Sequence, residues 1–130
     1  MKILLDTCCI IWAASDPKKL TPAAISALES DDAEVYVSAI SCAEVACLAE
    51  RTRIALDRHW KVWFNAVIDT NQWSVIDIGL DIVQEAYSLP DPFHRDPADR
   101  LITATARLRG LSVVTADEKI LSYPHVPSVW

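Results

Sequence analysis

The stretch DPADRLITATARLRGLSVVT, residues 96–115, contains a complete helix followed at once by a strand. Asp96 is a favourable N-cap, and Pro97 suits the first helical position, where a missing N–H costs nothing. Gly110 is well placed to end the helix in a left-handed conformation. The apolar, β-branched run Leu111–Thr115 then predicts a buried strand, so the segment indicates a helix–strand unit of an α/β protein.

The same alternation of strand and helix continues along the whole chain. Further helices are expected near residues 10–14, 21–30, 41–51, 57–70 and 80–89. Further strands are expected at Lys2–Leu5, Glu34–Ser38, Trp73–Ile78 and Val126–Trp130. Such a chain buries a mainly parallel sheet between two helical layers, so we predict a three-layer α/β/α sandwich with about four to five strands. Residues 1–130 are expected to form a single domain.

The composition narrows the class of protein. A net charge of −6 argues against nucleic-acid binding through a broad basic surface, and it fits acids gathered around a metal. Asp6 interrupts the apolar run at the N-terminus, and no apolar run approaches the roughly 20 residues of a membrane span, which argues against export and membrane insertion. The four cysteines have no zinc-like spacing, so we expect reduced core residues in a cytoplasmic protein.

Five acidic residues fall where the predicted fold has its ligand-binding edge. Asp6 ends the first strand, Glu44 lies in the first turn of a helix, and Asp117 follows the fourth strand. Asp96 and Asp99 open the long helix quoted above. Parallel sheets bind ligands at the carboxyl ends of their strands, and the helices that return to those ends begin at the same edge. We therefore expect the five carboxylates to lie close together.

Most of these acids also have a purely structural explanation. Glu44 has capping-box spacing to the serine three residues before it. Asp96 and Asp117 are natural N-caps, and Asp99 in a first turn complements the helix dipole. Asp6 is the exception, because no capping role is evident for an acid that closes the first strand.

Carboxylates crowded at one edge have a clear chemical use. They repel one another unless a cation neutralises them. Oxygen ligands without His or Cys suit Mg²⁺ or Mn²⁺ rather than zinc. A divalent ion at this edge would activate water and hold a phosphodiester oxygen, so the residues predict metal-dependent phosphoryl chemistry.

Four segments of the chain resemble the PIN domain, and more closely the VapC-type toxins of toxin–antitoxin pairs. These segments are Leu4–Thr7, Ser38–Glu44, Asp96–Ala106 and Val114–Asp117. Their order and spacing hold over nearly the whole chain, and the third segment is the most specific. The resemblance implies an endoribonuclease that hydrolyses RNA phosphodiester bonds with Mg²⁺ or Mn²⁺. It also implies a homodimer inhibited by a small cognate antitoxin.

The resemblance assigns roles to individual acids. The acidic quartet of the family falls on Asp6, Glu44, Asp99 and Asp117. Asp6 and Asp99 would be the principal metal ligands. Asp117 would complete a second or water-mediated metal site, and Glu44 would help to hold the metal or orient the attacking water.

The resemblance also implies supporting roles for other residues. Thr7 would orient Asp6, and Thr115 matches a small hydroxyl residue beside the metal site. Asp96 lies outside the quartet and is expected to be a helix cap first and a ligand second. Arg100 is a candidate for contact with RNA phosphate. Cys8 departs from relatives that carry His or an aliphatic residue there, but it touches none of the matched ligands.

Three further features were open to two interpretations. His94 is expected to be an exposed loop residue, with a proton relay as the alternative. Lys18 and Lys19 could belong to a basic rim for RNA, although charge runs usually face solvent. The aromatic stripe of Trp60, Trp63 and Phe64 is expected in the core, or else along a groove for an antitoxin helix.

Competing functions have weaker support. A dehalogenase-type phosphatase needs a second aspartate where the chain has Cys8. A receiver-type signalling domain needs an acidic pair at the first strand, but Leu5 precedes Asp6. A PIN-domain ribonuclease that processes RNA outside a toxin system is the main alternative, and a non-catalytic PIN scaffold is disfavoured by the complete quartet.

Overall fold

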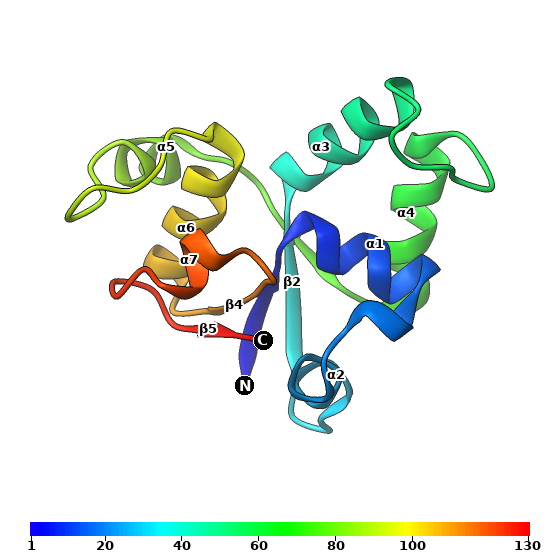
Figure 1. Cartoon of the computed structure of the whole chain (residues 1–130), viewed down its shortest axis with the longest axis horizontal. Helices are drawn as coiled ribbons and strands as arrows, with labels where there is room; N and C mark the ends of the chain where they lie inside the picture. The colour runs from blue at the N-terminus through cyan, green and yellow to red at the C-terminus, as the bar shows by residue number, and fades with distance from the viewer.

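The computed structural model describes all 130 residues, and its strands form a single sheet of five strands (Figure 1). The strands are β1 (Lys2–Leu5), β2 (Glu34–Ser38), β3 (Ser74–Ile76), β4 (Ser112–Val114) and β5 (Ser128–Val129). They lie in the order β3-β2-β1-β4-β5, and every neighbouring pair is parallel. The predicted α/β fold around a parallel sheet is therefore confirmed.

Helices cover both faces of this sheet. They are α1 (Thr7–Ser15), α2 (Pro22–Glu29), α3 (Ala39–Glu50), α4 (Trp60–Asn71), α5 (Leu80–Ala86), α6 (Pro97–Arg109) and α7 (Glu118–Leu121), with a 3-10 turn η1 (Pro17–Lys19). Figure 1 shows α5, α6 and α7 on one side of the sheet and α1, α2 and α4 on the other. The result is the predicted three-layer α/β/α arrangement.

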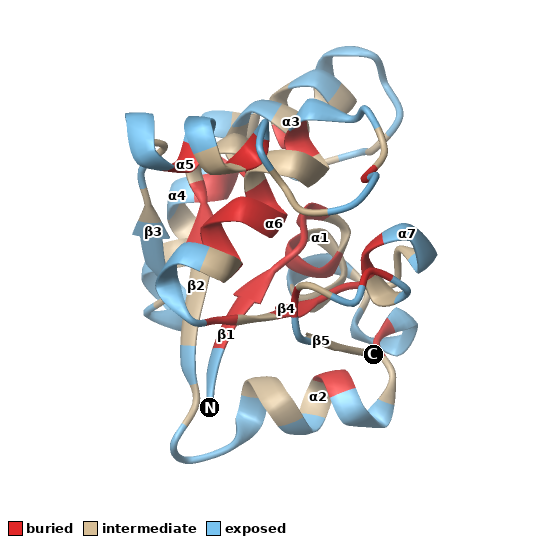
Figure 2. Ribbon diagram, turned by 90° about the vertical axis from the view of Figure 1, so that its left-hand side faces the viewer, coloured by how far each residue is buried: buried red, intermediate tan, exposed pale blue.

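Alternate residues of β1 face opposite helical layers, as the two-residue period of a strand requires. Ile3 and Leu5 belong to a buried cluster with residues of α1, α2 and α4. Leu4 belongs to a second cluster that includes Ile102 of α6. Figure 2 shows β1 and much of β4 and α6 among the most buried parts of the molecule. Each fully buried side chain of this kind contributes about 1.5–3 kcal/mol, so the strand ends are held firmly in place.

The register of the central strands brings separate chain segments to one edge. Leu5 pairs with Val37 of β2 and with Val114 of β4. Asp6 and Thr115, which follow two of these residues, therefore emerge side by side at the carboxyl end of the sheet. A backbone bond from the Asp6 N–H to the Val114 oxygen, at 3.0 Å, extends the ladder to this point.

Helix α1 begins three residues earlier than the sequence pattern suggested. It starts at Thr7 rather than near Ile10, and Asp6 occupies its N-cap position. The Asp6 Oδ1 accepts the Thr7 N–H at 2.8 Å. The expectation that Asp6 has no capping role is therefore wrong.

Helix α3 also starts earlier than expected. Its N-cap is Ser38 rather than Ser41, and the Ser38 hydroxyl oxygen accepts the Ile40 N–H at 3.2 Å. Ser41 lies inside the helix, so the predicted capping box between Ser41 and Glu44 is wrong. Because Glu44 has no role at the helix end, its carboxylate is available for contacts elsewhere.

The cysteines are all free, in agreement with the expected reduced state. Cys9 is buried, but Cys47 is exposed on α3, so the expectation of four core cysteines is wrong for that residue. None of the helices has the length and apolar character needed to cross a bilayer.

Candidate metal centre

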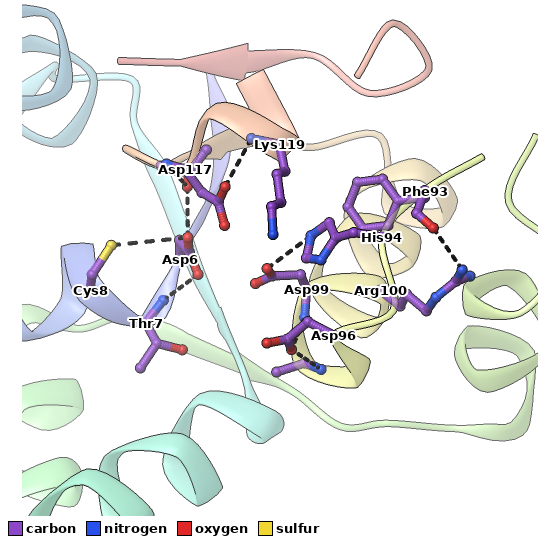
Figure 3. A network of polar contacts seen from close by, with 12 residues as sticks. Asp6, Thr7, Cys8, Phe93, His94, Asp96, Asp99, Arg100, Asp117 and Lys119 are labelled. Atoms are coloured by element: carbon purple, nitrogen blue, oxygen red, sulfur yellow. Dashed lines mark hydrogen bonds and ion pairs between the residues drawn. The ribbon is translucent and has the colours of Figure 1, made fainter. Parts of the chain in front are cut away.

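Asp6 lies at the centre of the acidic edge and is almost fully buried, with 6% of its surface exposed. Its Oδ2 accepts a hydrogen bond from the Thr115 hydroxyl at 2.6 Å and a longer one from the Cys8 thiol at 4.0 Å (Figure 3). The expectation that Cys8 touches none of the matched ligands is therefore wrong. The Thr115 hydroxyl oxygen in turn accepts the Asp117 N–H at 3.0 Å. Thr115 therefore fixes Asp6 and the backbone of Asp117 relative to each other.

Replacement of Thr115 by valine is expected to destabilise the protein by about 1–3 kcal/mol, because the buried Asp6 carboxylate loses one of its hydrogen bonds and the Asp117 N–H loses its acceptor. Thr115 itself is fully buried, so water cannot replace the hydroxyl without rearrangement. Urea unfolding of Thr115→Val and Thr115→Ser measures this effect. The serine variant keeps the hydroxyl, and an equal loss in both variants would mean that packing, not the hydrogen bonds, is responsible.

Thr7 connects Asp6 to Glu44. Its backbone N–H binds Asp6, as described above, while its hydroxyl donates to the Glu44 carboxylate. The hydroxyls of Thr7 and Ser41 are also hydrogen-bonded to each other, at 2.9 Å. Glu44 is thereby held at the same edge as Asp6, although 38 residues separate the two in sequence. Thr7 contacts Asp6 through its backbone N–H, and its side chain contacts Glu44 and Ser41.

The first turn of α6 supplies two more carboxylates. One oxygen of Asp96 accepts the N–H groups of Ala98 and Asp99, at 2.9 and 3.2 Å, which is the expected N-cap. The Asp99 carboxylate takes no part in capping. Its Oδ2 lies 3.0 Å from the Nε2 of His94, and only 13% of its side chain is exposed. Figure 3 shows Asp99 facing Asp6 and Asp117 across the site.

The electrostatics of the site reflect this crowding. Burial, followed by the charges of Asp6, Asp96 and Asp117, raises the pKa of Asp99 to about 8. Burial also raises the pKa of Asp6 and that of Glu44, against the lowering effect of their hydrogen bonds to Thr115 and Thr7. Carboxylates in this state are neutralised either by protons or by a cation. The donor set fits a divalent ion that prefers oxygen ligands.

The metal-free protein is expected to lose stability as the pH rises towards 8. An aspartate ordinarily has a pKa of 3.8, and that of Asp99 is about 8, so between these values the folded state binds more protons than the unfolded state. The free energy of unfolding therefore falls across that window. Melting curves at pH 5.5 and pH 8 in chelator should show a lower melting temperature at pH 8, which Mg²⁺ or Mn²⁺ restores by several degrees. A melting temperature unaffected by metal at pH 8 would contradict this.

The cationic residues considered for RNA contact are not gathered at the site. The Arg100 guanidinium donates to the carbonyl oxygens of Ala86 and Phe93, both at 2.9 Å. These bonds favour a structural role for Arg100, and its contact with RNA stays a prediction. Lys18 and Lys19 lie in η1, beyond the far end of α1 from Asp6.

Two residues at the site were undervalued from sequence. His94 was expected to be exposed, but only 18% of its side chain is exposed, and its Nε2 faces Asp99. Lys119 is an exposed residue whose side chain extends between Asp117 and His94 in Figure 3. The proximity of His94 to Asp96 in sequence was the one available signal, but it did not reveal the direction of the ring.

The chain matches a known protein family over nearly its whole length. The model of the PIN domain matches residues 3–126 of the chain. The chain belongs to the PIN domain family. A relative named Ribonuclease VapC22, from Mycobacterium tuberculosis, is 37% identical over 123 residues, which cover 95% of this chain and 92% of the relative.

Solved structures show the same fold at lower sequence identity. VapBC2 from Rickettsia felis, bound to a DNA fragment from its promoter, matches with a TM-score of 0.71 and 16% identity, covering 98% of this chain and 97% of that one. A toxin–antitoxin complex from Klebsiella pneumoniae matches with a TM-score of 0.65 and 24% identity, covering 95% and 94%. The PIN fold assigned to the chain is therefore the fold of known toxin–antitoxin proteins.

Proposed function

We propose that this PIN-domain protein is a metal-dependent endoribonuclease and the toxin of a toxin–antitoxin pair. The observation that carries the proposal is the cluster of carboxylates at one edge of the sheet, in which Asp6 is buried and Glu44, Asp99 and Asp117 are half-buried. The negative charges of such carboxylates repel one another, and a bound divalent ion reduces this repulsion. The name of the relative at 37% identity, a ribonuclease, supports RNA as the substrate.

In this proposal the four acids of the quartet have different roles. Asp6, Asp99 and Asp117 hold the metal, which we expect to be Mg²⁺ or Mn²⁺. When bound, the ion supplies Lewis acidity that activates water and stabilises charge on the phosphodiester. Glu44, fixed by the Thr7 hydroxyl, would help to hold the metal or to orient the attacking water. The capping carboxylate of Asp96 adds negative charge beside the quartet and holds the start of α6 in position.

An antitoxin is the expected protein partner, since solved structures of this fold include toxin–antitoxin complexes. The aromatic stripe on α4 contributes mainly to the core, because Trp63 and Phe64 are buried. Trp60 is partly exposed and lines a surface pocket with Ile54 and Leu56. This pocket is the part of the stripe that remains accessible to an antitoxin helix.

We also expect a homodimer in the cytoplasm. Helix α5 exposes Leu80 and Val83, and Tyr87 at its C-cap is exposed as well; a second copy would cover these side chains. Light scattering of the purified protein tests this expectation, since the chain has a mass of 14.4 kDa and a dimer twice that value.

The direct test is cleavage of total cellular RNA by the purified protein, with Mg²⁺ or Mn²⁺ and with chelator. Discrete fragments that require metal would support the nuclease, and sequencing their ends would identify the target. Loss of cleavage on addition of the product of an adjacent small gene would support the toxin assignment. Metal-dependent cleavage with no such inhibitor would favour RNA processing instead, and no cleavage by the folded protein would contradict the nuclease.

A further inference from the structure

His94 is positioned beside the carboxylates by its neighbours in the segment between α5 and α6. The Phe93 ring packs against the His94 ring at a centroid distance of 4.5 Å and is itself buried in the core cluster around α6. The Arg100 guanidinium binds the Phe93 carbonyl, so the backbone next to His94 is fixed as well. The imidazole therefore has a defined direction, which Figure 3 shows to be towards Asp99.

His94 and Asp99 are in close contact, but their alignment does not make a hydrogen bond. Nε2 of His94 lies 3.0 Å from Oδ2 of Asp99, yet this nitrogen is buried and has no hydrogen-bond partner. Hydrogen bonds weaken steeply when donor and acceptor are misaligned. A buried polar atom without a partner is uncommon in a folded protein, and a bound ion is one of the arrangements that satisfies such an atom.

The spacing of the surrounding atoms fits a shared cation. Ligands at about 2.1 Å from an octahedral ion lie about 3.0 Å apart when they are neighbours, and 3.0 Å is the distance between the two atoms here. A ring nitrogen of His94 and carboxylate oxygens of Asp99 and Asp117 all lie within 4.8 Å of one another. These three groups could therefore hold one metal ion.

We propose that His94 supplies a nitrogen ligand, alongside Asp99 and Asp117, to the divalent ion of this site, and that the site consequently prefers Mn²⁺ to Mg²⁺. The inference rests on the proposed metal-dependent function and specifies the ion. Mg²⁺ is a hard cation that favours oxygen ligands, whereas first-row transition ions also accept imidazole. Nitrogen coordination thus distinguishes this site from a cluster of carboxylates alone.

Pulsed EPR of Mn²⁺ bound to the metal-free protein, without RNA, tests the nitrogen ligand directly. We expect ¹⁴N modulation from a coordinated imidazole in the wild type and its loss in His94→Gln. Calorimetric titration should show that this substitution raises the Kd for Mn²⁺ by about tenfold or more, and the Kd for Mg²⁺ less than about threefold. The matched control is His125→Gln, because His125 pairs with Asp91 away from the carboxylates and carries a similarly placed Nε2 at 2.6 Å from an aspartate.

Each other outcome overturns a different statement. Mn²⁺ that binds the wild type without ¹⁴N modulation would overturn the ligand role of His94 and leave the proposed nuclease intact. Equal weakening of Mn²⁺ and Mg²⁺ in His94→Gln would reduce His94 to a positioning residue for Asp99. A wild type that binds neither ion would overturn both this inference and the proposed function. Circular dichroism and melting temperatures of both variants establish that any change is not a loss of fold.

Discussion

RNA cleavage by Asp99→Asn is expected to be slower than cleavage by the wild type by about 100- to 1,000-fold, the effect of removing one preorganised electrostatic contact from an active site. Asp99 combines the features that a principal metal ligand needs. It is mostly buried, it is not used for capping, and it faces Asp6, Asp117 and His94. An amide in its place keeps the shape but removes the charge that attracts the ion.

The same substitution is expected to stabilise the metal-free protein at pH 8. The pKa of Asp99 is about 8 because burial and the neighbouring charges oppose its ionisation. Asparagine removes that penalty, and solvent screening limits the gain in the free energy of unfolding to about 1–2 kcal/mol. The melting temperature of Asp99→Asn in chelator should therefore exceed that of the wild type at pH 8, and the two should converge as the pH falls.

A matched control separates these effects from a general change of charge. Asp69 is an exposed aspartate on α4, and Asp69→Asn alters the net charge by the same amount. It should change neither the cleavage rate nor the response of the melting temperature to metal. If Asp99→Asn cleaves RNA at a rate close to that of the wild type, Asp99 is not a ligand that the reaction requires.

The elements with strong local signals were predictable from sequence. The strand Glu34–Ser38 and the helix ends at Asp96 and Gly110 agree with the structure, because alternation and capping are decided by nearby residues. The start of α3 was missed because Ser38 and Ser41 are both good caps, and only packing selects between them. Local patterns therefore fixed the type of each element more securely than its first residue.

The site was predictable as a location but not as a set of contacts. The carboxyl ends of parallel strands meet at one edge of the sheet regardless of which side chains the strands carry. The edge that carries Asp6 and Asp117 therefore follows from topology. The bond between Thr7 and Glu44 joins two helices, and no periodicity indicates it. The direction of His94 depends on where Phe93 is buried, which is a property of the assembled core.

Replacement of Arg100 by methionine is expected to lower the free energy of unfolding substantially. The Arg100 guanidinium satisfies the carbonyl oxygens of Ala86 and Phe93 and lies 5.4 Å from the centre of the Tyr87 ring. Methionine keeps much of the apolar stem but leaves both carbonyls without a donor. Hydrogen bonds from charged groups contribute about 1.5–3 kcal/mol each, so we expect a loss of about 3 kcal/mol in the free energy of unfolding. Urea unfolding at pH 7 measures it.

The Arg100 variants also decide between the two roles considered for this residue. Arg100→Lys keeps the charge but cannot donate to both carbonyls from one planar group, so it should recover less than half of the lost stability. If Arg100 instead binds RNA phosphate, the lysine variant should retain RNA affinity and both variants should unfold like the wild type. A structural clamp predicts a further result, because the Phe93 carbonyl adjoins His94. Loosening that segment should weaken Mn²⁺ binding in Arg100→Met even though Arg100 is not a ligand.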